Sequence, residues 1–364
     1  MKKLLFVLAF IMCSSMSAMA YITNASGYIV AYVDGTTTNE DFTLLQLWES
    51  WADGDPLTRG DAGYKAEVKH YANVGPCLVA LWSQNPTAAK HPQISPAPGW
   101  EHKGFWIEGA RCNGLNFYED YTTVSNMVVV TTGDGIYVYS SAEYWIADGN
   151  LIHANGSGQY GLVQSAVVNA VLTDIKWRNN VVTGPFSEGM RVYVVNDFFT
   201  SPRADVDMHH NTVYKSTTYG IRYVEHPAGP GTPKAEGDVS NNTVTDSGTQ
   251  DYIFKNIYGG ALNGTITGSH NASSDTSSRN VSVVGAITNV VSVDEFLDCA
   301  IYDLRLRPGS QYHGAGTYLA SVPIDCIGDV RANPPTIGAF ELTGMLRQMY
   351  ITQHAKREED YDYM

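Results

Sequence analysis

One short pattern occurs three times along the chain: Asn180-Val181-Val182-Thr183, Asn211-Thr212-Val213-Tyr214 and Asn242-Thr243-Val244-Thr245. Counting outward from these runs, asparagines recur with spacings of 24, 30, 31 and 31 residues, at Asn126, Asn150, Asn180, Asn211 and Asn242. A glycine followed by an apolar residue comes after each of the first four asparagines: Gly135-Ile136, Gly161-Leu162, Gly189-Met190 and Gly220-Ile221. A period of this length predicts a repeat protein with one supersecondary unit per period.

The length of the period indicates which supersecondary unit is repeated. Three strands of about five residues and three turns of two to six residues give a coil of about 25 residues, close to the observed spacing. The runs after the asparagines are rich in β-branched residues, as strands require, and no unit holds a long helical pattern. Leucine-rich repeats need several leucines per unit, and propeller blades need longer periods. We therefore predict an all-β fold, a parallel β-helix solenoid of stacked strand triangles.

The asparagines have a structural role in such a coil. We expect them at tight turns, where an asparagine tolerates a left-handed backbone, and we expect them to bond to one another along the axis. Alternation along each strand directs inward the residues two positions later, Ile152, Val182, Val213 and Val244. It directs outward the next residues, His153, Thr183, Tyr214 and Thr245. Gln164 interrupts the apolar inward pattern after Gly161.

Residues 1–20 have the composition of a secretory signal peptide. Two lysines precede an apolar stretch, and Ala18-Met19-Ala20 forms a small-x-small cleavage site. We expect cleavage after Ala20 and a secreted, extracellular protein, with a periplasmic or surface-attached location as the alternatives. No later segment of the sequence is apolar enough to span a membrane.

Composition divides the remaining chain into three parts. Residues 21–104 hold four of the seven tryptophans and a proline-rich stretch, which predicts an N-terminal cap, with a short helix in residues 41–51. Residues 105–344 are expected to form the β-helix with its C-terminal capping segment. Residues 345–364 are charged and lack glycine, which is typical of a terminal helix or tail.

Export would place four cysteines in an oxidising compartment, where two disulfides are expected: Cys77, Cys112, Cys299 and Cys326. Three pairings are open. We favour Cys77 with Cys112 and Cys299 with Cys326, because each bond would staple one end of the solenoid. No Cys-x-x-Cys or histidine spacing indicates a metal site.

The charge of the chain excludes some partners. The formal net charge is −14, and it becomes −16 without Lys2 and Lys3, since 21 basic side chains then face 37 acidic ones. Such a surface repels nucleic acid and anionic lipid at long range. The same charge weighs against polyanionic substrates unless a local basic groove exists. Export and the tyrosine content, rather than the charge, favour a polysaccharide or cell-surface glycan as the expected partner.

The Asn-Thr-Val coils resemble the right-handed parallel β-helix, or pectin-lyase-like, superfamily. Further segments are similar to the ends of secreted and phage-associated β-helix proteins: residues 41–49, Leu306-Arg307-Pro308-Gly309-Ser310, Gly328-Asp329-Val330-Arg331 and Ile337-Gly338-Ala339-Phe340-Glu341. The resemblance implies the right-handed fold, with Arg331 and Glu341 closing the last coil. It selects no activity, because this fold hosts lyases, hydrolases, esterases, tailspikes and adhesins alike.

The catalytic signatures of that superfamily are absent from the sequence. It contains no Asn-Thr-Asp, Gly-His-Gly or Arg-Ile-Lys of the pectin-degrading hydrolases, and no Trp-x-Asp-His of the calcium-dependent pectate lyases. No cofactor is therefore expected, although a calcium site built from scattered aspartates stays open.

The coil register brings polar side chains of neighbouring turns together on one outward face. It superposes Lys176 on Asp207 and Arg178 on His209, with turns about 4.8 Å apart. On a uronate polysaccharide, Arg178 would neutralise the carboxylate, and Lys176 or His209 would remove the neighbouring proton, which predicts a lyase site. The alternative is a solvated sheet face with paired charges.

A second outward stripe stacks Arg191 on Arg222, both two residues past the repeat glycine, with Tyr137 in the equivalent earlier position. Like charges this close require an anion or an acid between them, so the stripe predicts binding of an acidic sugar. The alternative is that the arginine stems cover apolar surface while their charged ends lie in water.

These patterns leave two functions. The first is a secreted enzyme or binder that acts on polysaccharide, with lyase or glycoside-hydrolase chemistry if it is an enzyme. The second is a noncatalytic surface protein, a phage-type adhesin or a structural β-helix, which the missing signatures and the acidic surface favour.

Overall fold

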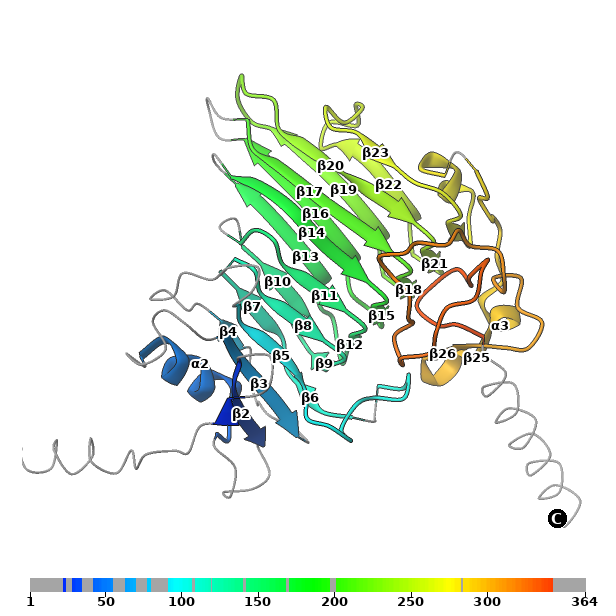
Figure 1. The fold of residues 1–364 in the computed structure, drawn as a ribbon. Coiled ribbons are helices and arrows are strands. Elements are labelled where there is room, and N and C mark those ends of the chain that lie inside the picture. The colour runs from blue at the N-terminus through cyan, green and yellow to red at the C-terminus, as the bar shows by residue number, and fades with distance from the viewer. Residues whose placement is uncertain are drawn as a thin grey trace, which may run out of the picture.

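The described part of the chain is a parallel β-solenoid of about six turns (Figure 1). This computed structural model describes residues 22–23, 28–34, 42–54, 63–69, 77–79, 91–106, 109–118, 120–139, 142–167, 170–196, 201–282 and 284–342. The predicted all-β solenoid is confirmed. The predicted signal peptide and the charged tail lie outside the described residues.

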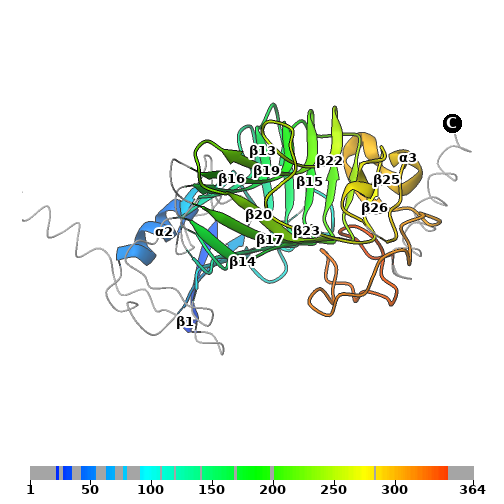
Figure 2. The same ribbon diagram turned by 90° about the horizontal axis from the view of Figure 1, so that it is seen from above.

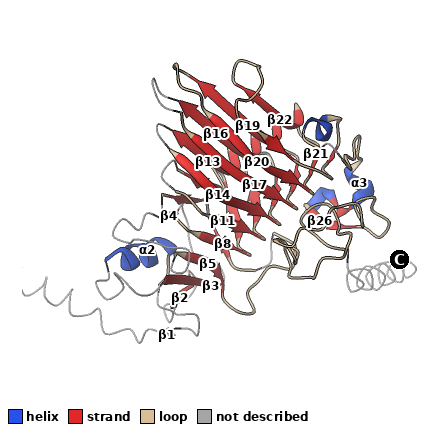
Figure 3. Cartoon of the chain, turned by 45° about the horizontal axis from the view of Figure 1, so that its top comes forward, coloured by secondary structure: helices blue, strands red, loops and turns tan. Residues whose placement is uncertain are grey.

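Three sheets run along the solenoid (Figures 1 and 3). Sheet 1 has the order β1 (Ile22–Thr23), β2 (Tyr28–Asp34), β3 (Gly63–Lys69), β5 (Gln93–Pro96), β8 (Thr123–Ser125), β11 (Ile146–Asp148), β14 (Val171–Arg178), β17 (Arg203–His209), β20 (Lys234–Ser240) and β23 (Ile266–Thr267). Sheet 2 has the order β22 (Gln250–Asn256), β19 (Tyr219–Pro227), β16 (Glu188–Asn196), β13 (Tyr160–Val167), β10 (Ile136–Val138), β7 (Leu115–Phe117) and β4 (Cys77–Val79). Sheet 3 has the order β24 (Ala272–Ser273), β21 (Thr243–Thr245), β18 (Thr212–Tyr214), β15 (Val181–Thr183), β12 (Leu151–Ala154), β9 (Val128–Thr131) and β6 (Arg111–Cys112).

The described strands of sheet 1 pair in parallel from β2 onward, after an antiparallel start between β1 and β2. Parallel pairing thus begins inside the segment that we expected to form the cap. Helix α2 (Leu45–Gly54) confirms the predicted short helix and packs Leu45, Trp48 and Trp51 into the core at the N-terminal end of the stack (Figure 1). No helix of the described residues is long and apolar enough to cross a membrane.

The repeat residues line the interior as the alternation predicts. Ile152, Val182, Val213 and Val244 are at most 1 % exposed. The repeat glycines face this column, and a Cβ on Gly189 would lie only 2.3 Å from Cγ1 of Val213 in the next turn. The glycine is required because the β-branched side chain fills the space that a Cβ would need. This contact explains why the asparagine runs and the glycine–apolar pairs recur together along the chain.

Gln164 lies in the regular strand register, although it is a polar residue at an inward position. It pairs with Val192 of the next turn and is fully buried. Its Oε1 accepts a hydrogen bond from Nε1 of Trp145 at 2.6 Å, so the amide oxygen is satisfied inside the core.

A ladder of buried asparagines runs along the axis between sheets 1 and 3. Side-chain bonds of 2.9 to 3.1 Å join consecutive members, Nδ2 to Oδ1, through Asn150, Asn180, Asn211, Asn242 and Asn271. Each of these Oδ1 atoms also accepts the backbone N–H of the preceding member. The predicted bonding along the axis is therefore confirmed for Asn150, Asn180, Asn211 and Asn242, and Asn271 extends the ladder by a member that was not predicted.

Two details of the ladder differ from the prediction. Asn126 does not belong to it, because Met127 takes the equivalent position and its N–H donates to Oδ1 of Asn150 at 3.1 Å. The left-handed residue is the one before the ladder position, as at Asn179 with φ 57°. Asn126 shares that conformation with φ 55°. Asparagine suits the left-handed position because it tolerates a positive φ, and it suits the ladder position because its amide bonds along the axis. The spacing of the asparagines therefore did not distinguish the left-handed position from the ladder position.

The C-terminal segment, residues 287–342, covers the outer side of sheet 3 (Figures 1 and 2). Its apolar residues, including Phe296, Leu304 and Phe340, form a second core with Leu151 and Val181 of the sheet. The side chains predicted to face outward from this sheet are consequently buried rather than solvated: His153, Thr183, Tyr214 and Thr245.

Hydrogen bonds fix this segment alongside the solenoid. Nη2 of Arg331 donates to Oδ1 of Asn179 at 2.7 Å, and the N–H of Gly338 donates to the carbonyl oxygen of Asn241 at 2.8 Å. Glu341 lies 3.6 Å from Arg331 in an ion pair that is almost fully buried. These two residues were expected to close the last coil. Arg331 instead attaches the segment to the side of the central turns, while Glu341 pairs with Arg331 and Thr336 inside the segment.

The predicted disulfides, Cys77 with Cys112 and Cys299 with Cys326, are wrong. None of Cys112, Cys299 and Cys326 forms a disulfide. Cys112 lies in sheet 3 and packs in the interior core, whereas Cys77 begins a strand of sheet 2. Cys299 and Cys326 are separate members of the second core, where each fills apolar space.

Candidate functional site

The residues of the predicted lyase site lie on sheet 1 in the expected register. Lys176 pairs with Asp207, and Arg178 pairs with His209, across β14 and β17. The register is therefore confirmed, while the catalytic role of these residues stays a prediction.

Carboxylates compensate both cations of this set. Nζ of Lys176 lies 2.6 Å from Oδ1 of Asp174. Nε of Arg178 donates to Oδ2 of Asp148 at 2.9 Å, and its Nη1 donates to the carbonyl oxygen of Ser321 at 2.9 Å. Arg178 thus holds the C-terminal segment against sheet 1, and neither cation presents an uncompensated charge to a ligand.

His209 has the geometry of the set that most resembles a catalytic base. Its Nε2 lies 3.1 Å from Oδ1 of Asp238, whose backbone N–H donates to Oδ1 of Asp207 at 2.9 Å. Burial alone would raise the pKa of Asp238, but hydrogen bonds from His209, Ser240 and Thr267 lower that pKa below its usual value. A histidine oriented by a charged carboxylate is an arrangement that general bases use.

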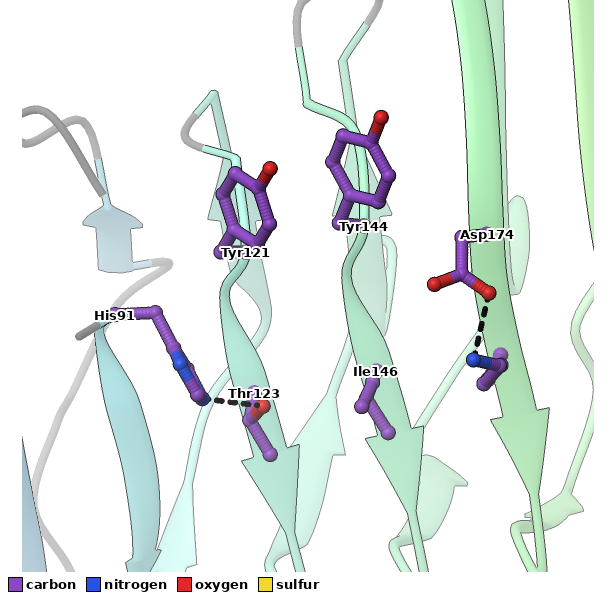
Figure 4. Close-up of a pocket in the computed structure, with 7 residues that line it drawn as sticks. His91, Tyr121, Thr123, Tyr144, Ile146 and Asp174 are labelled. Carbon is purple, nitrogen blue, oxygen red and sulfur yellow. Dashed lines mark hydrogen bonds and ion pairs between the residues drawn. The ribbon is translucent and has the colours of Figure 1, made fainter. Parts of the chain in front are cut away.

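Lys176 belongs to a pocket of ≈ 300 Å³ on sheet 1 (Figure 4). The pocket spans β5, β8, β11 and β14, and its lining consists of His91, Tyr121, Thr123, Tyr144, Ile146, Asp174 and Lys176. Arg178, Asp207 and His209 are not part of this lining. The predicted lyase set therefore divides, with Lys176 in the pocket and the other three residues outside it.

The predicted arginine stripe forms on sheet 2. Arg191 and Arg222 pair directly across β16 and β19, and Tyr137 occupies the same column on β10, with Val163 of β13 between it and Arg191. Glu188 is the acid that the stacked charges require. Its Oε1 lies 2.6 Å from Nη1 of Arg222, and its Oε2 lies 3.5 Å from Nε of Arg191. Two arginines therefore share one carboxylate.

Tyrosine rings surround the two guanidinium groups. The Cζ atom of Arg191 lies 4.2 Å from the ring centroid of Tyr193 and 4.9 Å from that of Tyr160. The Cζ atom of Arg222 lies 4.7 Å from the ring centroid of Tyr219. These distances are in the cation–π range. We define the tyrosine–arginine face as the set Tyr137, Tyr160, Glu188, Arg191, Tyr193, Tyr219 and Arg222.

The groups of this face hold defined protonation states. Burial raises the pKa of Tyr137, Tyr160 and Tyr193, so their hydroxyls remain protonated at neutral pH. The side chains of Arg191 and Arg222 are only 13 % and 17 % exposed, and their Nε atoms have no hydrogen-bond partner among the described residues. The face therefore combines flat rings, neutral hydroxyls and two positioned, partly desolvated guanidinium groups.

Several residues of the two candidate sites were not predicted. Tyr160, Glu188 and Tyr219 form one column, each directly before a repeat glycine, so extending the register by one residue would have found them. Tyr121 and Tyr144 of the pocket carry no comparable signal, because they lie in turns between strands rather than in the repeated runs.

No protein-family model matches this chain, and no curated protein matches it significantly. Among the described residues, no group of three or more His, Cys, Asp or Glu is placed to hold a metal ion.

Proposed function

We propose that this solenoid binds an acidic polysaccharide along the tyrosine–arginine face. The observation that carries the proposal is the single carboxylate, Glu188, shared by Arg191 and Arg222. It leaves one positive charge in surplus between tyrosine rings, on a chain with a net charge of −14. An anionic glycan would be attracted to this face and repelled by the rest of the surface.

The charged groups at the edge of the face are one acid and one base, so together they leave the surplus of one positive charge unchanged. Oδ1 of Asp134 accepts the N–H of Tyr160 at 3.1 Å, and burial raises the pKa of this carboxyl group. Lys255 follows in the column of Tyr193, beyond Val224 of β19. One carboxyl group and one ammonium group thus flank the central arginines.

The shape and chemistry of the face fit a polymer of sugar rings. Tyrosine rings can contact the C–H faces of sugars, and a guanidinium group binds a carboxylate or sulfate with two parallel hydrogen bonds. Successive strands lie about 4.8 Å apart, so the column from Tyr137 to Arg222 extends for about 14 Å along the axis. That length admits more than one sugar unit.

Isothermal titration with polygalacturonate and with neutral dextran tests the proposal. We expect the wild-type protein to bind polygalacturonate and not dextran. The double variant Arg191→Gln/Arg222→Gln should bind at least about tenfold more weakly, which corresponds to about 1.4 kcal/mol. The double variant Arg191→Lys/Arg222→Lys should lose less affinity, because it keeps the charge and loses only the planar fork.

The matched control removes two positive charges elsewhere. Lys215→Gln/Lys234→Gln has the same net charge as the arginine-to-glutamine variant and leaves the face intact. Its affinity should stay within about twofold of wild type. Equal losses in both double variants, or no binding of polygalacturonate by the wild type, would refute the proposal.

A second candidate function is cleavage of the glycan by elimination, favoured by the contact between His209 and Asp238. Neutral His209 would take the proton beside a uronate carboxylate, the bond to the leaving sugar would break, and a carbon–carbon double bond would form. Arg178 pairs in register with His209, and its ion pair with Asp148 would have to open before its guanidinium group could stabilise the charge that develops on the carboxylate.

The absorbance of the unsaturated product tests this reaction. The wild-type protein should release such product from an acidic polysaccharide, with or without added calcium, and His209→Ala should release none. Absence of product from the wild type excludes elimination and leaves the binding proposal in place.

A further inference from the structure

The pocket on sheet 1 is built around a pair of tyrosines (Figure 4). The ring centroids of Tyr121 and Tyr144 lie 4.6 Å apart, with an angle of 11° between the ring planes. Figure 4 shows the two rings side by side, with their hydroxyls at the same end. Thr123 and Ile146, which pair across β8 and β11, follow two residues after the tyrosines. A stacked pair of tyrosine rings thus adjoins a short strip of sheet.

Polar groups close the two ends of the pocket. At one end, Asp174 and Lys176 form an ion pair of 2.6 Å, and their side chains are 56 % and 35 % exposed. At the other end, Nε2 of His91 lies 3.2 Å from Oγ1 of Thr123. Because the carboxylate compensates the ammonium group, the lining carries no net charge while His91 is neutral.

The backbone of the pocket adopts an uncommon conformation in three successive turns. Tyr121, Tyr144 and Asp174 have φ values of 57°, 55° and 58°. The left-handed region costs residues other than glycine on the order of 1 kcal/mol each, whereas glycine adopts it readily. Each of these positions nevertheless places a large or charged side chain in the pocket. Strain of this kind is often retained where the side chain has a use.

We propose that this pocket binds a single neutral sugar ring. The tyrosine rings and Ile146 would contact the C–H face of the sugar, while Asp174 would accept hydrogen bonds from its hydroxyls and Lys176 would donate to them. The compensated charges favour an uncharged polyol over a uronate. The volume of ≈ 300 Å³ lies at the small end of ligand pockets, which suits one ring rather than a chain.

Binding of galactose, glucose, mannose and galacturonate, measured by saturation-transfer NMR and calorimetry, tests the proposal. The informative variant is Tyr144→Gly, because glycine accepts the φ of 55° and removes the ring without adding backbone strain. At least one of the neutral sugars should bind the wild type at millimolar concentration. Tyr144→Gly and Asp174→Asn should each weaken that binding at least about tenfold, with a melting temperature close to that of wild type.

Tyr318→Ala serves as the control, since it removes an exposed tyrosine from the C-terminal segment and should leave sugar affinity unchanged. Three results would overturn the proposal: no neutral sugar binds, Tyr144→Gly binds as well as wild type, or galacturonate binds more tightly than galactose. The inference is independent of the tyrosine–arginine face. Neutral-sugar binding should survive in Arg191→Gln/Arg222→Gln, so failure at one site is distinguishable from failure at the other.

Discussion

Asn180 donates from Nδ2 to Oδ1 of Asn211 at 3.0 Å, although 31 residues separate them. Asn211 donates in turn to the carbonyl oxygen of Trp177 at 2.8 Å and to Oδ1 of Asn242 at 2.9 Å. Both asparagines are fully buried. One amide therefore links three consecutive turns and fixes their register.

Replacing Asn211 with alanine should be strongly destabilising. Asn211→Ala leaves the backbone and side-chain N–H groups of Asn180 without their acceptor inside the core. Unsatisfied buried groups cost about 1–3 kcal/mol each, so the free energy of unfolding in urea should fall by roughly 3–5 kcal/mol. Asn126→Gly, at a left-handed position outside the ladder, should change it by less than about 1 kcal/mol. Equal losses would contradict the structural role of the ladder.

The repeat glycine should not tolerate even one added carbon. In Gly189→Ala the new Cβ would lie 2.3 Å from Cγ1 of Val213, so the neighbouring turn must shift. Overpacking of this kind costs about 1–3 kcal/mol, which thermal unfolding would detect. Gly133→Ala is the matched control, because its nearest neighbour atom would be 3.9 Å away. If Gly133→Ala proved as damaging, the steric explanation would fail.

Removal of Arg331 should loosen the C-terminal segment. The side chains of Arg331 and Glu341 are 1 % and 2 % exposed, so Arg331→Ala would leave a buried carboxylate without its cation. Breaking one partner of a buried pair costs about 3–5 kcal/mol. We expect a lower melting temperature and faster limited proteolysis within residues 287–342. The exposed Arg279→Ala should show neither effect, and a proteolysis rate equal to wild type in Arg331→Ala would contradict the contact.

Acid should destabilise the fold before any carboxylate reaches its usual pKa. Burial lowers the pKa of His102 and of His153 to about 4, and burial together with the charge of Arg331 places the pKa of His210 well below its ordinary value. The unfolded chain binds these protons near pH 6.5, so the contribution of the three neutral histidines to stability is fully present above that pH and declines as the pH falls towards about 4.

Melting temperatures measured between pH 7.5 and 4.5 check this prediction. His153 stacks on Trp106 with ring centroids 4.3 Å apart, so His153→Phe should keep the ring contact and remove part of the decline. A melting temperature that stays constant or rises on acidification would contradict the buried neutral histidines.

The register of the strands could be predicted because it follows from the alternation of inward and outward residues along each strand. Val182, Val213 and Val244 stand at fixed distances from their asparagines, and inward packing of β-branched residues leaves one arrangement of strands. The pairing of Arg191 with Arg222 follows from that register alone. An anion or acid between the two arginines was also predicted, and Glu188 could have been identified as that acid because it directly precedes the repeat glycine.

Contacts between distant segments were not predictable in this way. His153 and Thr183 have the polarity of solvated positions, yet residues more than 100 positions later cover them. The same segment buries Cys299 and Cys326 as apolar fillers, which a count of cysteines reads as a disulfide. The pocket depends on turn residues such as Tyr144, whose left-handed backbone follows no repeated spacing.

The C-terminal segment alters how a stack of turns can come apart. In an open repeat array each turn touches only its neighbours, so the ends can fray independently. Here Nε1 of Trp106, which precedes β6 of sheet 3, donates to the carbonyl oxygen of Ile301 at 3.3 Å, while Asn241, which precedes β21 of the same sheet, accepts from the N–H of Gly338. Turns that share no contact with one another are thereby joined through a single strap. The solenoid should melt as one cooperative unit rather than unzip from either end.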